Sequence, residues 1–243
     1  MKNNILLLVL LAVFGTTNAQ EATNFSHFSS WNSFTPKVNL SEQFYAKSEF
    51  HIRRTNFLAV WEQFLARPSI HYKPNDTFDF AIGYSFLRNY SYSDFSIPIN
   101  ANEHNIWEQV ALSHKEAVYG FNHRFRFEQR FIDNIITTVN GDFGIDGTNY
   151  ANRFRYRFSV SRPLFKIVEG KKVSINFFDE IFLSLDDGLE PTALNQNWVY
   201  LGFSVPIRIN ISFGLGYHHI GLNSSNEVFV SEEILAASIS LSL

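Results

Sequence analysis

Alternation of apolar and polar residues dominates the chain from about Trp31 to the C-terminus. It runs in segments of roughly 10 to 14 residues, which is the length and period of tilted membrane strands. The clearest segment has apolar side chains at every second position: Phe78, Phe80, Ile82, Tyr84 and Phe86. After the N-terminal region, no stretch shows a convincing helical period. The chain is therefore predicted to be all-β.

Eleven such segments can be read along the chain. Strands are expected over residues 27–35, 40–53, 60–73, 78–86, 104–115, 121–131, 153–160, 171–184, 195–206, 209–218 and 233–243. A bacterial single-chain barrel normally has an even number of strands. Either the segment 27–35 enters the lumen or pairs only partly, which leaves ten strands, or a further strand makes twelve. The expected fold is one antiparallel, up-and-down transmembrane β-barrel of about 10–12 strands.

A water-soluble β-sandwich is the alternative, because its strands also alternate. Two features favour the barrel over the sandwich. The apolar face is rich in aromatic residues, with 26 Phe in 243 residues. The opposite face carries Gly and Ser as well as charge, which suits a narrow lumen. Connections alternate between short turns and longer loops at 91–103, 132–149, 185–194 and 221–232, as in outer-membrane barrels.

The N-terminus has the order of residues that is typical of a secretory signal peptide. Lys2 precedes an apolar run from Ile5 to Phe14 that is too short to span a bilayer, and small residues end at Ala19. We expect residues 1–19 to be a cleaved signal and residues 20–243 to be the barrel, located in the outer membrane. The expected partners are outer-membrane lipid and, during insertion, the barrel-assembly machinery.

Composition excludes several classes of function. The chain has no cysteine, so a lipoprotein anchor, a disulfide scaffold, a thiolate metal site and a cysteine nucleophile are all excluded. Without the signal the formal charge is 19 minus 23, or −4, which gives no support to nucleic-acid binding. Aspartates in the loops lack calcium-loop spacing, and neither a metal nor another cofactor is expected.

Five segments together resemble the domain-of-unknown-function 2490 family of predicted outer-membrane barrel proteins. They are Arg67-Pro68 followed by Tyr72, the stretch from Glu103 to Gln109, the stretch from His123 to Phe131, the stretch from Asn152 to Arg157, and the stretch from Asp179 to Leu183. One departure is Asn197-Trp198, where the family pattern has an arginine after the asparagine. The resemblance covers nearly the whole mature chain. It implies an outer-membrane barrel and no established activity.

Two arginine rows are the strongest chemical feature. Arg124, Arg126 and Arg130 flank Glu128 at alternate positions, and Arg153, Arg155 and Arg157 follow the next long loop. Alternate positions share one face of a strand, and the apolar faces of the same strands should meet lipid, so these arginines should point into the lumen. Expected carboxylate partners are Glu62, Glu108, Glu128, Asp179 and Glu180, with Arg67 as a further lumen cation.

Three functions fit this lumen. The first hypothesis is a narrow channel for small, anionic solutes, because arginine suits phosphate and carboxylate. Alternatively, it is packed with ion pairs in a closed structural or partner-binding barrel that acts through its outer loops. The third hypothesis is a lipid-modifying enzyme that uses a Ser and a His, with candidate pairs Ser69 with His71, Ser113 with His114, and Ser212 with His218 and His219. None of these pairs lies in a known nucleophile motif, so no catalytic residue is assigned.

Overall fold

The computed structural model describes residues 23–93, 96–168, 171–225 and 228–243, all in strands or their connections. The strands are β1 (Thr23–Asn39), β2 (Phe44–Thr55), β3 (Val60–Tyr72), β4 (Phe78–Asn89), β5 (Ala101–Glu116), β6 (Tyr119–Thr137), β7 (Phe143–Val168), β8 (Lys171–Leu185), β9 (Pro191–Arg208), β10 (Ile211–Ser225) and β11 (Val228–Ser242). Each of the predicted segments corresponds to one of them, so the all-β prediction is confirmed. The expected signal peptide lies outside the described residues.

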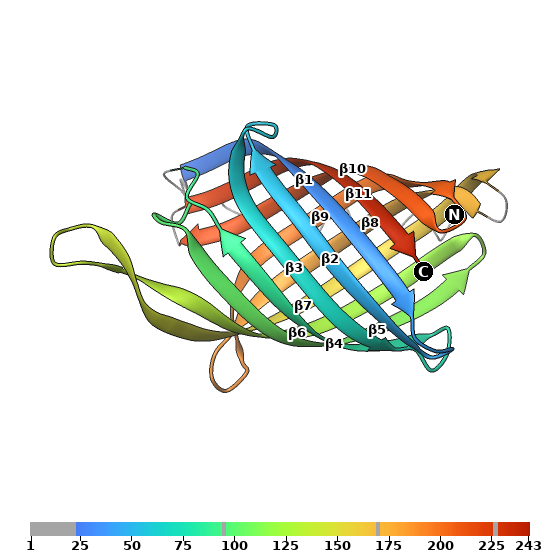
Figure 1. Cartoon of the computed structure of the whole chain (residues 1–243), viewed down its shortest axis with the longest axis horizontal. Coiled ribbons are helices and arrows are strands. Elements are labelled where there is room, and N and C mark those ends of the chain that lie inside the picture. The colour runs from blue at the N-terminus through green and yellow to red at the C-terminus, as the bar shows by residue number, and fades with distance from the viewer. Residues whose placement is uncertain (1–22, 94–95, 169–170, 226–227) are drawn as a thin grey trace, which may run out of the picture.

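The strands form one sheet that closes on itself into a barrel (Figure 1). Each strand pairs antiparallel with the next in the chain, and β1 closes the sheet by pairing parallel with β11, from Thr23 opposite Val228 to Lys37 opposite Ser242. The barrel prediction is confirmed and the sandwich alternative is wrong. The expectations of an even strand number and of purely antiparallel pairing are also wrong, because β1 is hydrogen-bonded on both sides and is a full strand of the wall.

The two ends of the barrel differ. We call the end where β1 finishes the turn end; its connections include residues 117–118 and 209–210, and β11 also finishes there. The opposite end, the loop end, carries the connection 90–100 and the β6–β7 hairpin, which projects well beyond the wall (Figure 1). Much of the loop expected over 132–149 is strand, because β6 and β7 pair as far as Thr137 and Phe143. No helix in the described residues is long and apolar enough to cross a membrane.

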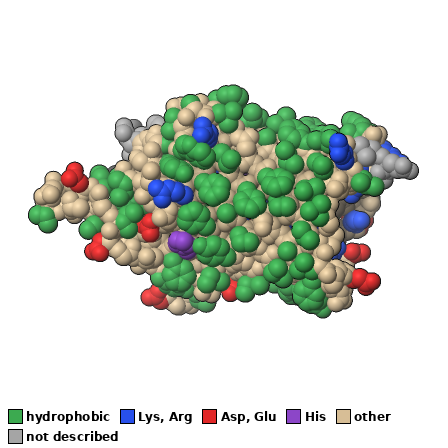
Figure 2. Space-filling view, viewed as in Figure 1, with side chains coloured by type: hydrophobic (Ala, Val, Ile, Leu, Met, Phe, Trp, Pro, Cys, Tyr) green, Lys and Arg blue, Asp and Glu red, His purple; other side chains and the backbone are tan. Residues whose placement is uncertain are grey.

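The outer face of the wall is apolar. Hydrophobic side chains cover its middle in the view of Figure 2, and most charged side chains lie toward the two ends. Exposed side chains on this face include Phe50, Ile70, Phe80, Ile82, Phe125, Phe177, Leu201, Phe203, Leu215 and Ile239. The alternate residues face inward and are largely polar or charged.

Glycines on the inner face make room for aromatic rings. A Cβ atom on Gly83 would lie 2.2 Å from the ring of Trp107, and a Cβ atom on Gly216 would lie 2.6 Å from the ring of Tyr200. Each ring therefore lies flat against the backbone of a neighbouring strand, since only a glycine permits so close an approach. This arrangement fills the lumen with aromatic groups as well as charges.

Candidate functional site

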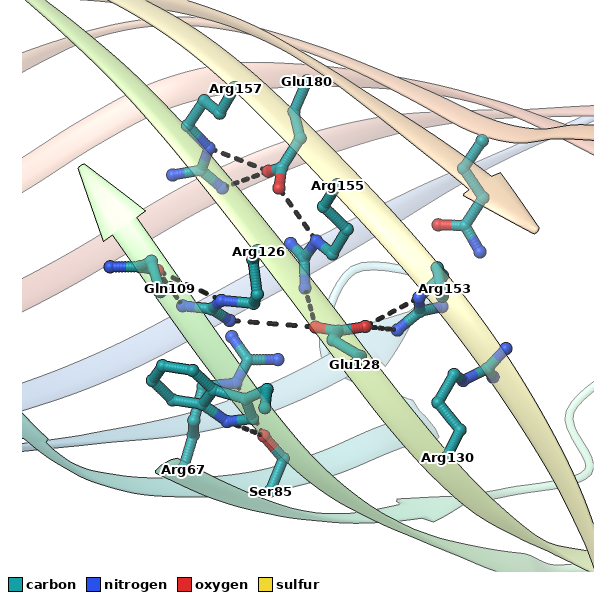
Figure 3. A network of polar contacts seen from close by, with 12 residues as sticks. Arg67, Ser85, Gln109, Arg126, Glu128, Arg130, Arg153, Arg155, Arg157 and Glu180 are labelled. Atoms are coloured by element: carbon teal, nitrogen blue, oxygen red, sulfur yellow. Dashed lines mark hydrogen bonds and ion pairs between the residues drawn. The ribbon is translucent and has the colours of Figure 1, made fainter. Parts of the chain in front are cut away.

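Two fully buried carboxylates organise the middle of the lumen. Glu128 on β6 and Glu180 on β8 are both 0% exposed. Arg155, on β7 between them, donates from Nη1 to Glu128 at 2.8 Å and from Nε to Glu180 at 2.8 Å. Figure 3 shows its guanidinium lying between the two carboxylates. Residues from three adjacent strands are thus joined through one buried arginine.

The other arginines of the two rows complete this network. Arg153 donates from Nε to Glu128 at 2.7 Å, and Arg157 donates from Nε to Glu180 at 2.8 Å. Arg124 donates from Nη2 to Glu180 at 2.5 Å. Charge-assisted bonds of this kind are stronger than neutral ones, and they offset part of the cost of burying the charges.

Arg126 differs from its neighbours because its main acceptor is neutral. It donates to the Gln109 side chain at 2.7 and 3.1 Å, and its guanidinium lies 4.0 Å from the ring centroid of Trp107. Its Nη1 lies 3.9 Å from Glu128 and has no hydrogen-bond partner. A buried guanidinium therefore retains an unused donor at the centre of the lumen.

Two further ion pairs flank the central network. Arg130 donates to Glu103 on β5 at 2.6 and 2.8 Å. Arg67 on β3 donates to Glu49 on β2 at 3.1 Å and to Ser85 at 2.9 Å. We call these central and flanking groups the arginine–glutamate layer: Glu49, Arg67, Glu103, Arg124, Arg126, Glu128, Arg130, Arg153, Arg155, Arg157 and Glu180. It holds seven arginines and four glutamates, so guanidinium groups are in excess.

Side chains fill the lumen at and next to this layer. Arg126, Arg155 and Trp107 are only 2%, 3% and 1% exposed. Toward the loop end, Arg53 on β2 lies 5.4 Å from the ring centroid of Trp198 on β9. These strands are separated around the wall by β1, β11 and β10, so this contact crosses the lumen. The described interior is therefore closed by side chains at this level.

Two of the expected carboxylates are not in the lumen. Glu108 is exposed on the outer face of β5, opposite Ile82 of β4 and Phe127 of β6, because Trp107 and Gln109 take the inward positions. Asp179 also faces outward and accepts a hydrogen bond from Asn197 at 2.7 Å. Their expected pairing with the arginines is wrong.

The partners that sequence reasoning missed are Glu49, Glu103 and Gln109. Each lies on a strand neighbouring an arginine row or Arg67. The sequence signal was available for Glu103 and Gln109, since they share one face of their segment with Asn105 and Trp107.

Glu62, another expected partner, is buried but accepts from the Trp31 indole at 3.1 and 3.2 Å. Trp198, which stands where the family pattern has an arginine, points inward and packs against Phe182 and Trp31.

The loop end of the lumen holds a separate cavity of about 310 Å³. Tyr92, from the connection between β4 and β5, donates to Glu232 of β11 at 3.2 Å. Because β3, β2 and β1 separate those elements around the wall, this connection reaches across the mouth of the barrel. Burial and the nearby Glu232 carboxylate raise the pKa of the Tyr92 phenol above its usual value. Tyr92 therefore stays protonated and able to donate.

One Ser–His pair is assembled toward the turn end. Ser69 Oγ lies 3.1 Å from His71 Nε2, and His71 Nδ1 lies 2.7 Å from Asp79. This order of groups resembles an acyl-transfer relay. However, Ser69 and His71 are 8% and 4% exposed, and the ring of Tyr45 stacks on His71 at 4.3 Å. The relay is covered, which favours a structural hydrogen-bond network.

The other Ser–His pairs do not form such a relay. Ser113 faces inward and accepts from Asn122, whereas its neighbour His114 stacks against Phe121 on the outer face. His218 is buried among aromatic rings, and His219 lies 3.0 Å from Glu233. Within the described parts of the chain, no group of three His, Cys, Asp or Glu side chains is arranged to hold a metal ion.

Fold and interior define a closed β-barrel with an apolar outer wall and an ion-paired lumen. The family model described as "Protein of unknown function (DUF2490)" matches residues 28–230, so the chain belongs to that family, and the resemblance is confirmed. No curated protein sequence matches it. A solved structure titled "NanC porin structure in rhombohedral crystal form" is similar at 12% identity and a TM-score of 0.47, over 88% of this chain and 99% of that one.

Proposed function

We propose that this protein is an outer-membrane β-barrel whose resting lumen is closed, and that it acts through its two ends. The apolar wall supports membrane insertion, because a closed barrel satisfies all backbone hydrogen bonds within the sheet and an apolar outer face suits lipid. The expected N-terminal signal agrees with export to the outer membrane.

The observation that carries the closed state is the burial of the arginine–glutamate layer. Glu128 and Glu180 have no exposed surface, and Arg126 and Arg155 have almost none. Open channels keep a charged lumen in contact with water. Glu128 and Glu180 are each shared among several guanidinium groups, and this network resists opening, since any displaced partner leaves a buried charge unpaired.

Planar-bilayer recording tests the closed state. The purified, refolded wild-type protein should give no steady conductance. The double variant Glu128→Ala with Arg155→Ala, which removes two central side chains without changing net charge, should conduct. The matched control is Glu116→Ala with Arg162→Ala, a Glu–Arg pair exposed toward the turn end, and it should stay closed. Steady conductance by the wild-type protein would contradict the proposal.

A narrow anion passage is the second candidate, and one observation favours it. The layer has seven arginines against four glutamates, and Nη1 of Arg126 and Nε of Arg124 lack hydrogen-bond partners. Unused guanidinium donors suit carboxylate or phosphate. If the wild-type protein conducts, the reversal potential in a KCl gradient should indicate anion preference, and Arg126→Gln should reduce that preference. Equal permeability of both ions would exclude this candidate.

A further inference from the structure

The hairpin of β6 and β7 continues beyond the wall as a two-stranded ribbon. β5 pairs with β6 only as far as Ile132, and β8 pairs with β7 only from Asn152. Beyond these positions, β6 and β7 pair with each other as far as Thr137 and Phe143. The ribbon projects well away from the barrel (Figure 1). Within the described parts of the chain, its two edges therefore have no neighbouring strand.

Hydrogen bonds between its two strands hold the ribbon in shape. Asn134 on β6 donates to the carbonyl of Asp146 on β7 at 3.1 Å, and it accepts from Asn149 at 2.9 Å. At the tip, the Thr138 amide donates to the Asp142 carbonyl at 2.7 Å. An isolated two-stranded hairpin is marginally stable at best in water. These bonds help to keep the ribbon formed without a third strand.

The start of β7 has an apolar face and an acidic face. Phe143 and Ile145 point to one face, because alternate residues of a strand share a face. They are 51% and 47% exposed, and Ile145 lies opposite Ile135 of β6. Asp146, and Asp142 directly before β7, occupy the alternate positions and are also exposed. An exposed apolar face of this kind is typical of an interaction surface.

The apolar face of the ribbon lies beyond the lipid-facing wall. Phe131 and Tyr150 contact each other at the limit of the wall, with their ring centroids 5.4 Å apart. Phe143 is seven positions further along β7 (150 minus 143), which is roughly 23 Å at about 3.3 Å per residue. The apolar band of a membrane barrel is only about 25 Å tall in total. Lipid around the wall therefore does not account for the exposure of Phe143.

Charge narrows the class of partner. Between Arg130 and Arg153, the charged residues of the sequence are Asp133, Asp142 and Asp146, and there is no Lys or Arg. A second copy of the ribbon carries the same charges, and lipid phosphates are also anionic, so neither complements the acidic face. Basic side chains do complement it. The ribbon therefore favours a partner that is both apolar and basic.

We propose that the β7 edge of this ribbon binds an extended segment of a partner protein in which apolar and basic residues alternate. A strand added at this edge places its apolar side chains beside Phe143 and Ile145, and its basic side chains beside Asp142 and Asp146. Backbone hydrogen bonds along the edge supply affinity, and the alternate side chains supply specificity. The inference rests on the proposed function and deepens it, because it names a partner class for the loop end.

Three synthetic peptides test the proposal against the protein in phosphatidylcholine nanodiscs, with empty nanodiscs as the background. Each has about ten residues, the length of a long strand. One alternates Lys and Val, one alternates Glu and Val, and one has the Lys and Val residues in two separate blocks. By fluorescence anisotropy, the alternating Lys-Val peptide should bind about tenfold or more tightly than either other peptide. No binding of this peptide, or equal binding of another, would overturn the proposal.

Variants of the apolar face assign the binding to the ribbon. Phe143→Ser with Ile145→Ser should weaken binding of the alternating Lys-Val peptide about tenfold or more. The matched control is Leu189→Ser with Leu194→Ser, two exposed leucines at or near the β8–β9 connection, and it should bind like wild type. Migration of unheated and boiled samples on a gel reports whether each variant folds. Unchanged binding by the folded Phe143 and Ile145 variant would overturn the assignment.

Variants of the acidic face test the role of charge. Asp142→Asn with Asp146→Asn should bring the affinities for the Lys-Val and Glu-Val peptides to within about threefold of each other. Asp187→Asn with Glu190→Gln, in the β8–β9 connection, removes the same charge and should keep the wild-type preference. A preference that persists without Asp142 and Asp146 would contradict the charge pairing. Conductance of the same samples reports on the lumen separately, so the closed state and the docking edge can fail independently.

Discussion

Glu128 and Glu180 are the residues on which the interior depends, because each is fully buried and binds several guanidinium groups. Arg155 links them, and Arg153 and Arg157 each complete one side. Burying so many charges is favourable only while the geometry keeps every carboxylate paired. The individual side chains are therefore interdependent, and loss of one affects all its partners.

Glu128→Gln should destabilise the barrel strongly. It leaves Arg153 buried with a neutral partner and Arg155 with Glu180 as its remaining carboxylate, and breaking a buried pair costs about 3–5 kcal/mol. The free energy of unfolding in urea, measured in lipid or detergent, checks this. Glu116→Gln, at the exposed end of β5, should change stability by less than about 0.5 kcal/mol. Equal effects of the two substitutions would show that the central ion pairs do not contribute to the free energy of unfolding.

The Ser69 relay gives a second prediction at this scale. Because Tyr45 covers His71, we expect the wild-type protein to hydrolyse p-nitrophenyl esters no faster than buffer. Ser69→Ala should instead lower the free energy of unfolding by about 1 kcal/mol through a lost hydrogen bond. Ester hydrolysis that disappears in Ser69→Ala would reverse this interpretation and make the relay catalytic.

The sequence predicts which side chains face the lumen where one face of a strand is polar and the other is apolar. It does not predict this where both faces are mixed. Arg126 and Arg155 alternate with aromatic residues, so their side of the wall is evident. In β5 the polarity of the two faces is mixed, because the inward face of Glu103 and Gln109 also carries Trp107 and the outward face carries Glu108. Glu108 was assigned to the wrong face for that reason. Specific pairs such as Arg130 with Glu103 depend on the register between strands, which no single strand encodes.

Strands are the elements that alternation predicts well, and their ends are less predictable. The hairpin of β6 and β7 extends far past the predicted limits because its alternation is interrupted. Ile135 and Ile136 are consecutive apolar residues, and the register shifts between Asp133 and Ile135. Such an irregularity removes the period-two signal while the backbone ladder continues.

The packing of Trp107 on Gly83 gives a prediction at the element scale. Gly83→Ala places a methyl group 2.2 Å from the indole ring, so the ring must move and lose its hydrogen bond to Ser85. We expect a loss of about 1–3 kcal/mol in unfolding free energy, as for overpacked cores, and a shift in tryptophan fluorescence. Gly188→Ala, in the β8–β9 connection, is the control and should behave like wild type. Unchanged fluorescence in Gly83→Ala would exclude this packing.

At the scale of the whole molecule, sequence predicted a barrel and the approximate number of strands, but not how the barrel closes. The alternation of β1 is the same whether its second neighbour runs parallel or antiparallel. Closure depends on the strand count, and an odd number requires one parallel pair in a meander. Here that pair joins β1 to β11.

Cysteine cross-linking tests this closure directly, because the chain has no cysteine of its own. Ser33 lies opposite Ser238 across the parallel pair, so Ser33→Cys with Ser238→Cys should form a disulfide under mild oxidation. The bond would change the migration of the boiled, unreduced protein. Ser33→Cys with Ser240→Cys is offset by two residues on the same face, beyond ordinary disulfide reach, and should cross-link poorly. The reverse result would contradict the parallel register.

The parallel pair also has a consequence for biogenesis. The β1–β11 pairing brings together residues that are 205 positions apart in the sequence, as between Lys37 and Ser242 (242 minus 37). Contacts between such distant segments form slowly because a long loop must close first. The edges of β1 and β11 therefore remain unpaired until the last strand is in place, and unpaired edges are prone to aggregation. The yield of folded protein therefore depends on keeping the edges of β1 and β11 from pairing with other chains before the barrel closes.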